Sequence, residues 1–335
     1  MLHKDTKISV LGDGGWGTTL ALLLAGKGYH VNLWGAFPDY VDEVRKKREN
    51  WKFLPGFKIP ENVNLVSDVH EACDSSEWIV LAAPSQFMRS VVRSIKKDKI
   101  RHKSFVTVAK GIETQSLKTM SQAIHEELGK IRLAVVSGPT IARDVALKMP
   151  AAASVASSNE ALASLARGIF STDYFNLFES DDVLGVELGG AIKNVIAIGA
   201  GIVQGLGYGS NTRAVLFARG VAEMSRLGEA MGARRQTFTG LSGLGDLATT
   251  CLSPHSRNRW LGEEIGKGRP LNKILKETEM VVEGVETARA AYQLSKKYKI
   301  SMPISQAVYK ILFHGDDPKD AVKAVMKRGP HRELD

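Results

Sequence analysis

The sequence ISVLGDGGWG, residues 8–17, decides the fold of this chain. Its apolar first half predicts a strand, its glycines follow the pattern GxGxxG, and the Ala- and Leu-rich residues 18–27 predict a helix. A second apolar run, His30–Trp34, completes the start of a β-α-β unit. This order is the fingerprint of a dinucleotide-binding turn. It predicts a Rossmann-type nucleotide site rather than a glycine turn that serves packing alone.

Each glycine of this turn has its own physical reason. Gly12 is expected to make the tight turn between strand and helix, and Gly17 to let the helix pack closely on the strand. Gly14 is expected to let backbone N–H groups approach a pyrophosphate. The helix that follows presents free N–H groups and a partial positive charge, which attract phosphate.

The composition is that of a globular protein with a full hydrophobic core. The chain has 335 residues, enough for two domains, and 44% of them are hydrophobic and 24% charged. The two cysteines, Cys73 and Cys251, form no CxxC pair and no disulfide framework, which fits a reducing cytoplasm. The polar first residues leave no room for a signal peptide, and Val195–Val203 is expected to be too short and too rich in glycine to span a bilayer. We therefore expect a cytoplasmic protein.

The formal net charge of +9 leaves three kinds of partner open: nucleic acid, a membrane surface, or the anionic ligands of an enzyme. The basic runs Arg45–Arg48 and Lys96–Lys103 lack interleaved aromatic residues, and we interpret them as solvated helix faces. A phosphorylated substrate and a pyrophosphate cofactor would benefit from the positive field without any nucleic acid.

Short apolar runs alternate with helical patterns up to about residue 180, and long helical patterns such as Asp181–Val203 follow. Asp181 or Asp182 could cap the first of these helices. We predict an α/β chain, with a Rossmann-type, mostly parallel sheet in a dinucleotide-binding domain at residues 1–181 and an all-helical substrate-binding domain at residues 182–335. The candidate strands are Lys7–Leu11, His30–Trp34, Trp78–Ala82, Phe105–Val108, Leu133–Ser137, Ala152–Ala156 and Tyr174–Phe178.

Several polar residues directly follow predicted strands, where open α/β sheets bind their ligands. Lys110 follows the strand Phe105–Val108, and Gly138 and Thr140 follow Leu133–Ser137. Since a lysine at a strand end is commonly a surface residue, the position alone leaves both roles open for Lys110.

Lys193 interrupts an otherwise apolar helical stretch, LGGAIKNVIAI, residues 188–198. Burying an unpaired ammonium group is costly, so the charge must be paired, extended to the surface or used in chemistry. An amine in such a place can act as a general base. A lysine paired with a carboxylate at a domain seam is the structural alternative.

Two more groups of polar residues follow in the helical half. Asp246 lies in the glycine-rich segment LSGLGDL, residues 241–247, where it could orient a lysine, accept a hydrogen bond from a substrate hydroxyl, or cap the next helix. Ser256, Arg257 and Asn258 begin a predicted helix and could form a phosphate cradle, although Ser256 could simply cap that helix. No histidine pair has metal-ligand spacing, so we expect no metal site.

Together these segments resemble the NAD(P)-dependent sn-glycerol-3-phosphate dehydrogenases of the bacterial soluble type. The resemblance implies hydride transfer between a nicotinamide cofactor and dihydroxyacetone phosphate or sn-glycerol 3-phosphate, which supplies glycerol phosphate for phospholipid synthesis. The matching segments follow the family order over nearly the whole chain: GDGGWGT (12–18), KGIE (110–113), SGPT (137–140), ELGGAIKNVIAIGAG (187–201), RGVAEM (219–224), GLGDL (243–247), SRNR (256–259) and VVEG (281–284).

The resemblance also implies roles for individual residues. Lys193 would accept the proton when the secondary hydroxyl is oxidised and donate it in reduction, with Lys110 and Asp246 as the other catalytic groups. The substrate would contact Lys110, Gly138, Thr140, Lys193, Asp246, Ser256, Arg257 and Asn258. The cofactor would contact Gly12, Gly14, Gly15, Trp16, Gly17, Lys110, Ala142, Arg257, Val281 and Glu283.

The expected cofactor is NAD or NADP. A site that prefers NAD usually carries an acidic residue about 20 residues after the first glycine, to bind the ribose hydroxyls. Here the second predicted strand ends in LWGAF, residues 33–37, with neither an acid nor an arginine for a 2′-phosphate. The missing acid argues against strict selectivity for NAD and slightly favours NADP.

Two other functions stay open at this point. A related two-domain reductase with an unphosphorylated substrate would have no use for the cluster Ser256–Asn258. A nucleotide sensor or nucleic-acid-binding protein would not need a lysine in the apolar setting of Lys193. The expected partners are a small phosphorylated substrate and a second copy of the chain in a homodimer, with no nucleic acid and no integral membrane segment.

Overall fold

The computed structural model describes residues 6–327. Its internal contacts divide the chain into two compact units. The first unit comprises the residues up to Lys110 together with residues 118–187, and the second comprises residues 111–117 together with those from Leu188 onward. The domain boundary between residues 181 and 182 stays a prediction.

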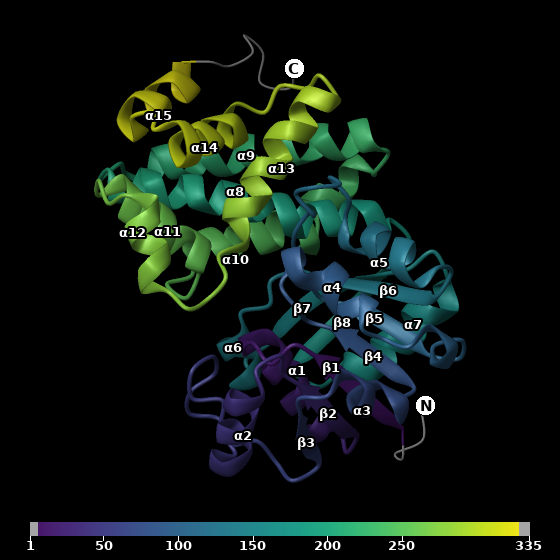
Figure 1. Cartoon of the computed structure of the whole chain (residues 1–335). Helices are drawn as coiled ribbons and strands as arrows, with labels where there is room; N and C mark the ends of the chain where they lie inside the picture. Colours follow the sequence, from purple (N-terminus) through teal and green to yellow (C-terminus); the bar gives the residue numbers. More distant parts are fainter. Residues whose placement is uncertain (1–5, 328–335) are drawn as a thin grey trace. The chain divides into compact units, whose positions relative to one another are not determined.

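The first unit is built on an eight-stranded sheet with the strand order β3-β2-β1-β4-β5-β6-β7-β8 (Figure 1). Every neighbouring pair is parallel except β6 and β7, which are antiparallel. The mostly parallel sheet predicted from the sequence is therefore confirmed. The strands are β1 Lys7–Leu11, β2 His30–Trp34, β3 Val63–Val66, β4 Trp78–Leu81, β5 Ser104–Thr107, β6 Arg132–Ser137, β7 Ala151–Ala156 and β8 Phe175–Ser180.

The predicted strands agree with the structure to within two residues at either end, but β3 was missed. This strand has only four residues, VNLV, and its Asn64 is exposed. Such a short segment carries too little of the alternating pattern to indicate a strand. Pairing with β2 holds it in the sheet.

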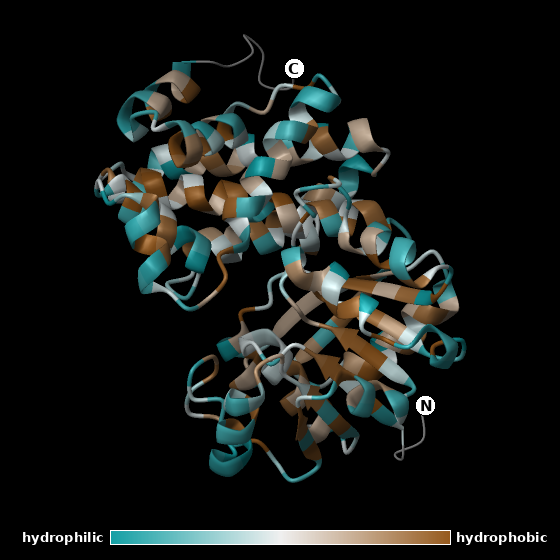
Figure 2. Cartoon of the chain, viewed as in Figure 1, coloured by the Kyte–Doolittle hydropathy of each residue, from teal (hydrophilic) through white to brown (hydrophobic). Residues whose placement is uncertain are grey.

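The sheet buries both of its faces, as its apolar strands predict (Figure 2). Successive residues point to opposite sides, so Ile8 and Val10 of β1 pack in one hydrophobic cluster and Leu11 in the other. The first cluster includes residues of α1 Gly15–Gly26, α2 Pro38–Lys47, α6 Ala142–Ala146 and α7 Glu160–Phe170. The second includes residues of α3 Val69–Asp74, α4 Met88–Arg93 and α5 Met120–Leu128, and short 3-10 turns lie at Ser85–Phe87 and Lys97–Lys99.

The second unit is helical, which confirms the predicted change of architecture (Figure 1). Asp182 caps α8, because its carboxylate accepts a hydrogen bond of 2.9 Å from the backbone N–H of Gly185. The helices are α8 Val183–Gly205, α9 Ser210–Met231, α10 Asp246–Leu252, α11 Arg257–Gly266, α12 Leu271–Glu277, α13 Glu283–Lys297, α14 Pro303–His314 and α15 Pro318–Lys327, with a 3-10 turn at Arg235–Thr239 and a π-helical turn, η4, at Leu241–Gly245.

Helix α8 is long and apolar enough to span a membrane, judged by length and composition only. The expectation that this region is too short was wrong, because the helix extends over 23 residues. Its most apolar 18-residue window is entirely buried inside the structure, as in the core helix of a soluble protein.

Helices α8 and α11 touch backbone to backbone. Gly201 and Gly205 of α8 lie at this contact, as do Gly262 and Gly266 of α11. A Cβ atom added to Gly262 would lie 2.0 Å from the carbonyl oxygen of Ile198, so the two helices approach this closely only because a side chain is missing. The glycines of both helices thus allow α8 and α11 to pack tightly.

Glu223 of α9 caps the N-terminus of α14 from a distance in sequence. Its carboxylate accepts hydrogen bonds from the backbone N–H groups of Ile304 and Ser305 and from the Ser305 hydroxyl. These are donors that a helix cannot satisfy by itself. The carboxyl group is fully buried, and this burial raises the pKa of Glu223 to about 7.

We expect the stability that Glu223 provides to depend on pH. Its pKa is about 7 in the folded chain against an ordinary 4.5, so folding favours the protonated carboxyl group. Its contribution to the free energy of unfolding is complete below the ordinary pKa of 4.5. This contribution is lost as the pH rises through about 7, the pKa of Glu223 in the folded chain. Unfolding of the wild type and of Glu223→Gln, which cannot titrate, should be compared at about pH 5 and about pH 8. From the lower to the higher pH the wild type should lose up to about 3 kcal/mol relative to the variant, and an equal difference at both pH values would contradict the prediction.

Candidate active site

The glycine-rich turn between β1 and α1 has the geometry that the sequence predicts. Gly12 adopts a φ angle of +127°, and a Cβ atom there would lie 2.7 Å from the backbone of Ala82. A Cβ atom on Gly17 would lie 1.8 Å from the carbonyl oxygen of Gly12, so only glycine lets α1 pack this closely. At Gly14 nothing lies within 4 Å of the corresponding position, which leaves space beside the turn.

The N-terminus of α1 is available to an anion. Gly14 is its N-cap residue, no side chain caps the helix, and its first turn contains no acidic residue. The backbone N–H groups of that turn are therefore placed to bind a phosphate group. These features fit the pyrophosphate of a dinucleotide.

Three other predicted cofactor residues lie beside this turn or within it. The Ala142 carbonyl, at the start of α6, accepts a hydrogen bond of 3.0 Å from the Thr19 hydroxyl of α1. The Trp16 ring packs edge-on against Phe175, with ring centroids 6.1 Å apart. A Cβ atom on Gly15 would lie 2.7 Å from the Phe53 carbonyl oxygen, so Gly15 is also tightly enclosed.

Lys110 binds the loop that follows β6. Its Nζ atom donates hydrogen bonds to the Gly138 carbonyl oxygen at 2.7 Å and to the Thr140 hydroxyl at 3.0 Å. The structure thus brings together three residues predicted to contact the substrate, at the carboxyl ends of β5 and β6. Beside them, the hydroxyl of Ser137 is buried and has no hydrogen-bond partner within residues 6–327. Ser137 was not singled out from the sequence, although its position directly before Gly138 was a usable signal.

Lys193 lies in the buried core of the second unit. It is 6% exposed and is the only buried lysine or arginine among residues 6–327. Its Nζ atom lies 2.9 Å from Oδ1 of Asp246 and donates a hydrogen bond of 2.6 Å to the Thr250 hydroxyl. That hydroxyl in turn donates to Asp246 at 3.3 Å. The pairing with a carboxylate, left open by the sequence, is therefore present, and it holds the amine in one position.

Asp246 is placed by an unusual piece of backbone. The predicted glycine-rich turn is the π-helical turn η4, and Asp246 is the first residue of α10 directly after it. A Cβ atom on Gly189 of α8 would lie 2.5 Å from the Ser242 carbonyl oxygen, so η4 lies directly against α8. This close contact brings the carboxylate to Lys193. Thr250 was missed, although its spacing of four residues from Asp246 on one helix places both on the same face.

Ser256 and Asn258 are both engaged at the start of α11. The Ser256 hydroxyl accepts a hydrogen bond of 3.2 Å from the Arg259 N–H, so the capping role left open by the sequence is present. The Asn258 amide donates to Asn194 at 2.8 Å and accepts from the Gly284 N–H at 2.9 Å. Asn258 therefore joins the starts of α11 and α13 to α8.

Arg257 is exposed, unlike its two neighbours. Its guanidinium group donates a hydrogen bond of 2.8 Å to the Val281 carbonyl oxygen. Glu283, two residues further on, is the first residue of α13. Arg257 thus lies next to the segment predicted to contact the cofactor. Within the described part of the chain, no three His, Cys, Asp or Glu side chains are grouped to hold a metal ion.

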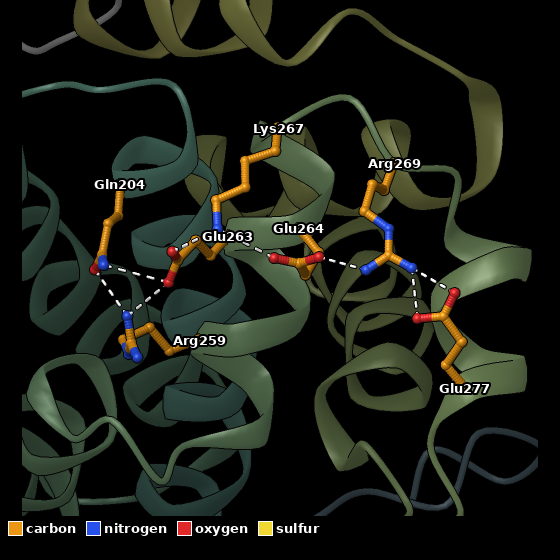
Figure 3. Close-up of polar contacts among 7 residues, drawn as sticks. All are labelled: Gln204, Arg259, Glu263, Glu264, Lys267, Arg269 and Glu277. Atoms are coloured by element: carbon orange, nitrogen blue, oxygen red, sulfur yellow. Dashed lines mark hydrogen bonds and ion pairs between the residues drawn. The ribbon is translucent and has the colours of Figure 1, made fainter.

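A network of polar contacts runs along α11, from Arg259 in its first turn to Arg269 beyond its last residue (Figure 3). Arg259 bonds both Gln204 of α8 and Glu263, at 2.9 and 3.0 Å. Arg269 contacts Glu264 and also Glu277 of α12. Exposed ion pairs stabilise little individually, but this network joins α11 to α8 and to α12. It fixes the helix whose first turn carries the candidate phosphate cradle.

Comparisons with known proteins agree over both halves of the chain. The family model described as NAD-dependent glycerol-3-phosphate dehydrogenase N-terminus matches residues 7–163, and that described as its C-terminus matches residues 182–323. A glycerol-3-phosphate dehydrogenase [NAD(P)+] of Syntrophotalea carbinolica is 48% identical over 98% of this chain and 99% of its own. One from Geobacillus kaustophilus is 44% identical over 98% and 96%.

The fold is shared with solved structures as well. A crystal structure of glycerol-3-phosphate dehydrogenase from Coxiella burnetii superimposes with a TM-score of 0.94. It is 35% identical in sequence, and the match covers 97% of this chain and all of that one.

Proposed function

The chain belongs to the NAD-dependent glycerol-3-phosphate dehydrogenase family, and on this premise we propose that it interconverts sn-glycerol 3-phosphate and dihydroxyacetone phosphate. The family match over both halves carries the proposal. Reduction of dihydroxyacetone phosphate would supply the glycerol phosphate of phospholipid synthesis. We infer that the enzyme acts in the cytoplasm as a homodimer, and its net charge of +9 suits an anionic substrate and cofactor.

The cofactor is NAD or NADP, and it accepts or supplies the hydride when bound. The uncapped N-terminus of α1 and the open space at Gly14 support a pyrophosphate site there. Gly12, Gly15, Trp16, Gly17 and Ala142 complete this part, and Lys110, Arg257, Val281 and Glu283 are the other proposed contacts. The slight preference for NADP predicted from the sequence rested only on the missing acid near residue 35.

Lys193 is the proposed proton carrier. In oxidation the neutral amine takes the proton of the secondary hydroxyl while the hydride leaves the same carbon, and in reduction the ammonium returns a proton to the new alkoxide. Asp246 and Thr250 hold Nζ through the contacts of 2.9 and 2.6 Å, so they position the amine. Lys110 provides a second positive charge for the developing alkoxide.

The phosphate of the substrate has its own proposed contacts. Ser256, Arg257 and Asn258 surround the first turn of α11, where helix N–H groups and a guanidinium group favour a dianion. Gly138 and Thr140 are the remaining substrate contacts on the sheet. Binding the phosphate away from the reacting carbon orients the substrate.

One assay tests the proposed function. Purified protein should be mixed with dihydroxyacetone phosphate and either NADH or NADPH, and the fall in absorbance of the reduced cofactor followed. We expect cofactor oxidation that requires dihydroxyacetone phosphate and does not occur with unphosphorylated dihydroxyacetone. Equal rates with both compounds, or none with the phosphate ester, would refute the function.

Replacing Arg257 by alanine should weaken substrate binding more than it slows chemistry. Loss of a charge-assisted hydrogen bond to phosphate is expected to raise the KM for dihydroxyacetone phosphate about ten- to a hundredfold, with a smaller change in kcat. Arg269→Ala is the matched control, because it removes an equal charge from an ion pair beyond the other end of the same helix. An unchanged KM in Arg257→Ala would exclude the guanidinium group from the phosphate site.

A further inference from the structure

Gly35 directly follows β2, and another residue occupies the space that a side chain at this position would fill. A Cβ atom there would lie 2.3 Å from Oδ2 of Asp13 and 2.6 Å from Val41. The backbone of Gly35 has no positive φ angle, so its conformation alone does not require glycine. The carboxylate of Asp13 therefore lies at the point where a side chain of residue 35 would begin.

Asp13 belongs to the glycine-rich turn itself, between Gly12 and Gly14. Its backbone carbonyl accepts hydrogen bonds from the Asn50 amide at 2.6 Å and from the Thr18 hydroxyl at 3.2 Å, which hold this part of the turn. Within residues 6–327 no other residue donates a hydrogen bond to its carboxylate. Burial raises the pKa of Asp13 to about 6. The group is therefore ionised above neutral pH.

We propose that Asp13 replaces the acid missing from the end of β2 and makes this enzyme select NAD over NADP. In dinucleotide-binding folds a carboxylate at that point accepts hydrogen bonds from the adenosine ribose hydroxyls. Here the carboxylate reaches the point from the first turn, 22 residues earlier in the chain, and Gly35 leaves the space for it. The 2′-phosphate of NADP would bring a second negative charge against it, which opposes binding.

This inference rests on the proposed function, because it requires a dinucleotide cofactor at this turn. It also reverses the preference predicted from the sequence. That prediction looked for an acid along β2, whereas the acid comes from β1 and its turn. Asp13 and Gly35 lie close together in space although they are 22 residues apart in the chain.

Binding experiments with fragments of the cofactor test the proposal without catalysis. The affinities of ADP-ribose and of 2′-phospho-ADP-ribose should be measured by calorimetry at about pH 8, where the carboxyl group is ionised. We expect the wild type to bind ADP-ribose at least about tenfold more tightly than 2′-phospho-ADP-ribose. In Asp13→Asn, which keeps the size of the side chain, this ratio should fall by about tenfold or more.

Asp39→Asn is the matched control, since Asp39 is exposed on the first turn of α2 and its loss changes the net charge equally. It should leave the ratio unchanged. Asp13→Ser provides a second variant, and thermal melting shows that each variant is folded. Tighter binding of 2′-phospho-ADP-ribose by the wild type, or equal ratios in the wild type and Asp13→Asn, would overturn the proposal. Failure to reduce dihydroxyacetone phosphate with either NADH or NADPH would refute the proposed function instead and leave the binding result standing.

Discussion

Lys193→Met is expected to lower kcat by about 10²–10⁴-fold while leaving cofactor affinity nearly unchanged. The variant keeps an unbranched side chain of similar length but has no atom that can exchange a proton with the substrate. The amine it removes lies 2.9 Å from Asp246 and 2.6 Å from Thr250 in the core of the second unit. Steady-state rates and titration with NADH check the two expectations separately.

This substitution also leaves the buried carboxylate of Asp246 without its cation, which by itself costs about 3–5 kcal/mol of stability. The double variant Lys193→Met/Asp246→Asn removes that charge, so it should recover much of the lost thermal stability and none of the turnover. Lys267→Met, at the exposed residue directly after α11, should leave kcat unchanged. Turnover near the wild-type rate in either variant that lacks Lys193 would refute its role as the proton carrier.

Gly262→Ala is expected to destabilise the helical unit by about 3 kcal/mol, although alanine favours a helix over glycine by about 1 kcal/mol. Its Cβ atom would lie 2.0 Å from the carbonyl oxygen of Ile198 and 2.8 Å from its carbonyl carbon. These are backbone atoms of a buried helix, so no side-chain rotation can relieve the overlap. Helix α11 would have to move away from α8, which breaks the contact along both helices.

Gly168→Ala is the matched control for this prediction. Gly168 lies within α7, it is exposed, and nothing lies within 4 Å of the position of an added Cβ atom. The same chemical change should there be neutral or stabilising by up to about 1 kcal/mol. Urea unfolding followed by circular dichroism compares the two variants, and equal stabilities would show that the close approach of α8 and α11 is not required.

The parts of the fold that depend on local patterns could be predicted from the sequence. The strands β1 and β2 have the predicted bounds, because their apolar residues and flanking residues are clear. The glycine turn was equally readable, since Gly12 and Gly17 are required by contacts between adjacent elements. The strand β3 was missed because its four residues form a strand only through pairing with β2.

The candidate site was predictable to the extent that single residues stand out from their surroundings. Lys193 stands out as a charge in an apolar helix. The resemblance to a family implied the roles of the other site residues. Thr250 and Ser137 were missed, because a hydroxyl among apolar residues is common and carries no pattern of its own. The partner of Thr250, and the lack of one for the Ser137 hydroxyl among residues 6–327, follow from packing.

By itself the sequence determined the Rossmann-type sheet, the helical second half, the glycine turn and the position of one buried lysine, because each is written in neighbouring residues. Only the tertiary structure decided which groups meet. It placed Asp246 against Lys193 through the contact of η4 with α8, and it placed Asp13 against Gly35 across two strands. Such contacts depend on distances between backbones that no local pattern encodes, and for that reason the acid absent from β2 in the sequence is present beside it in space.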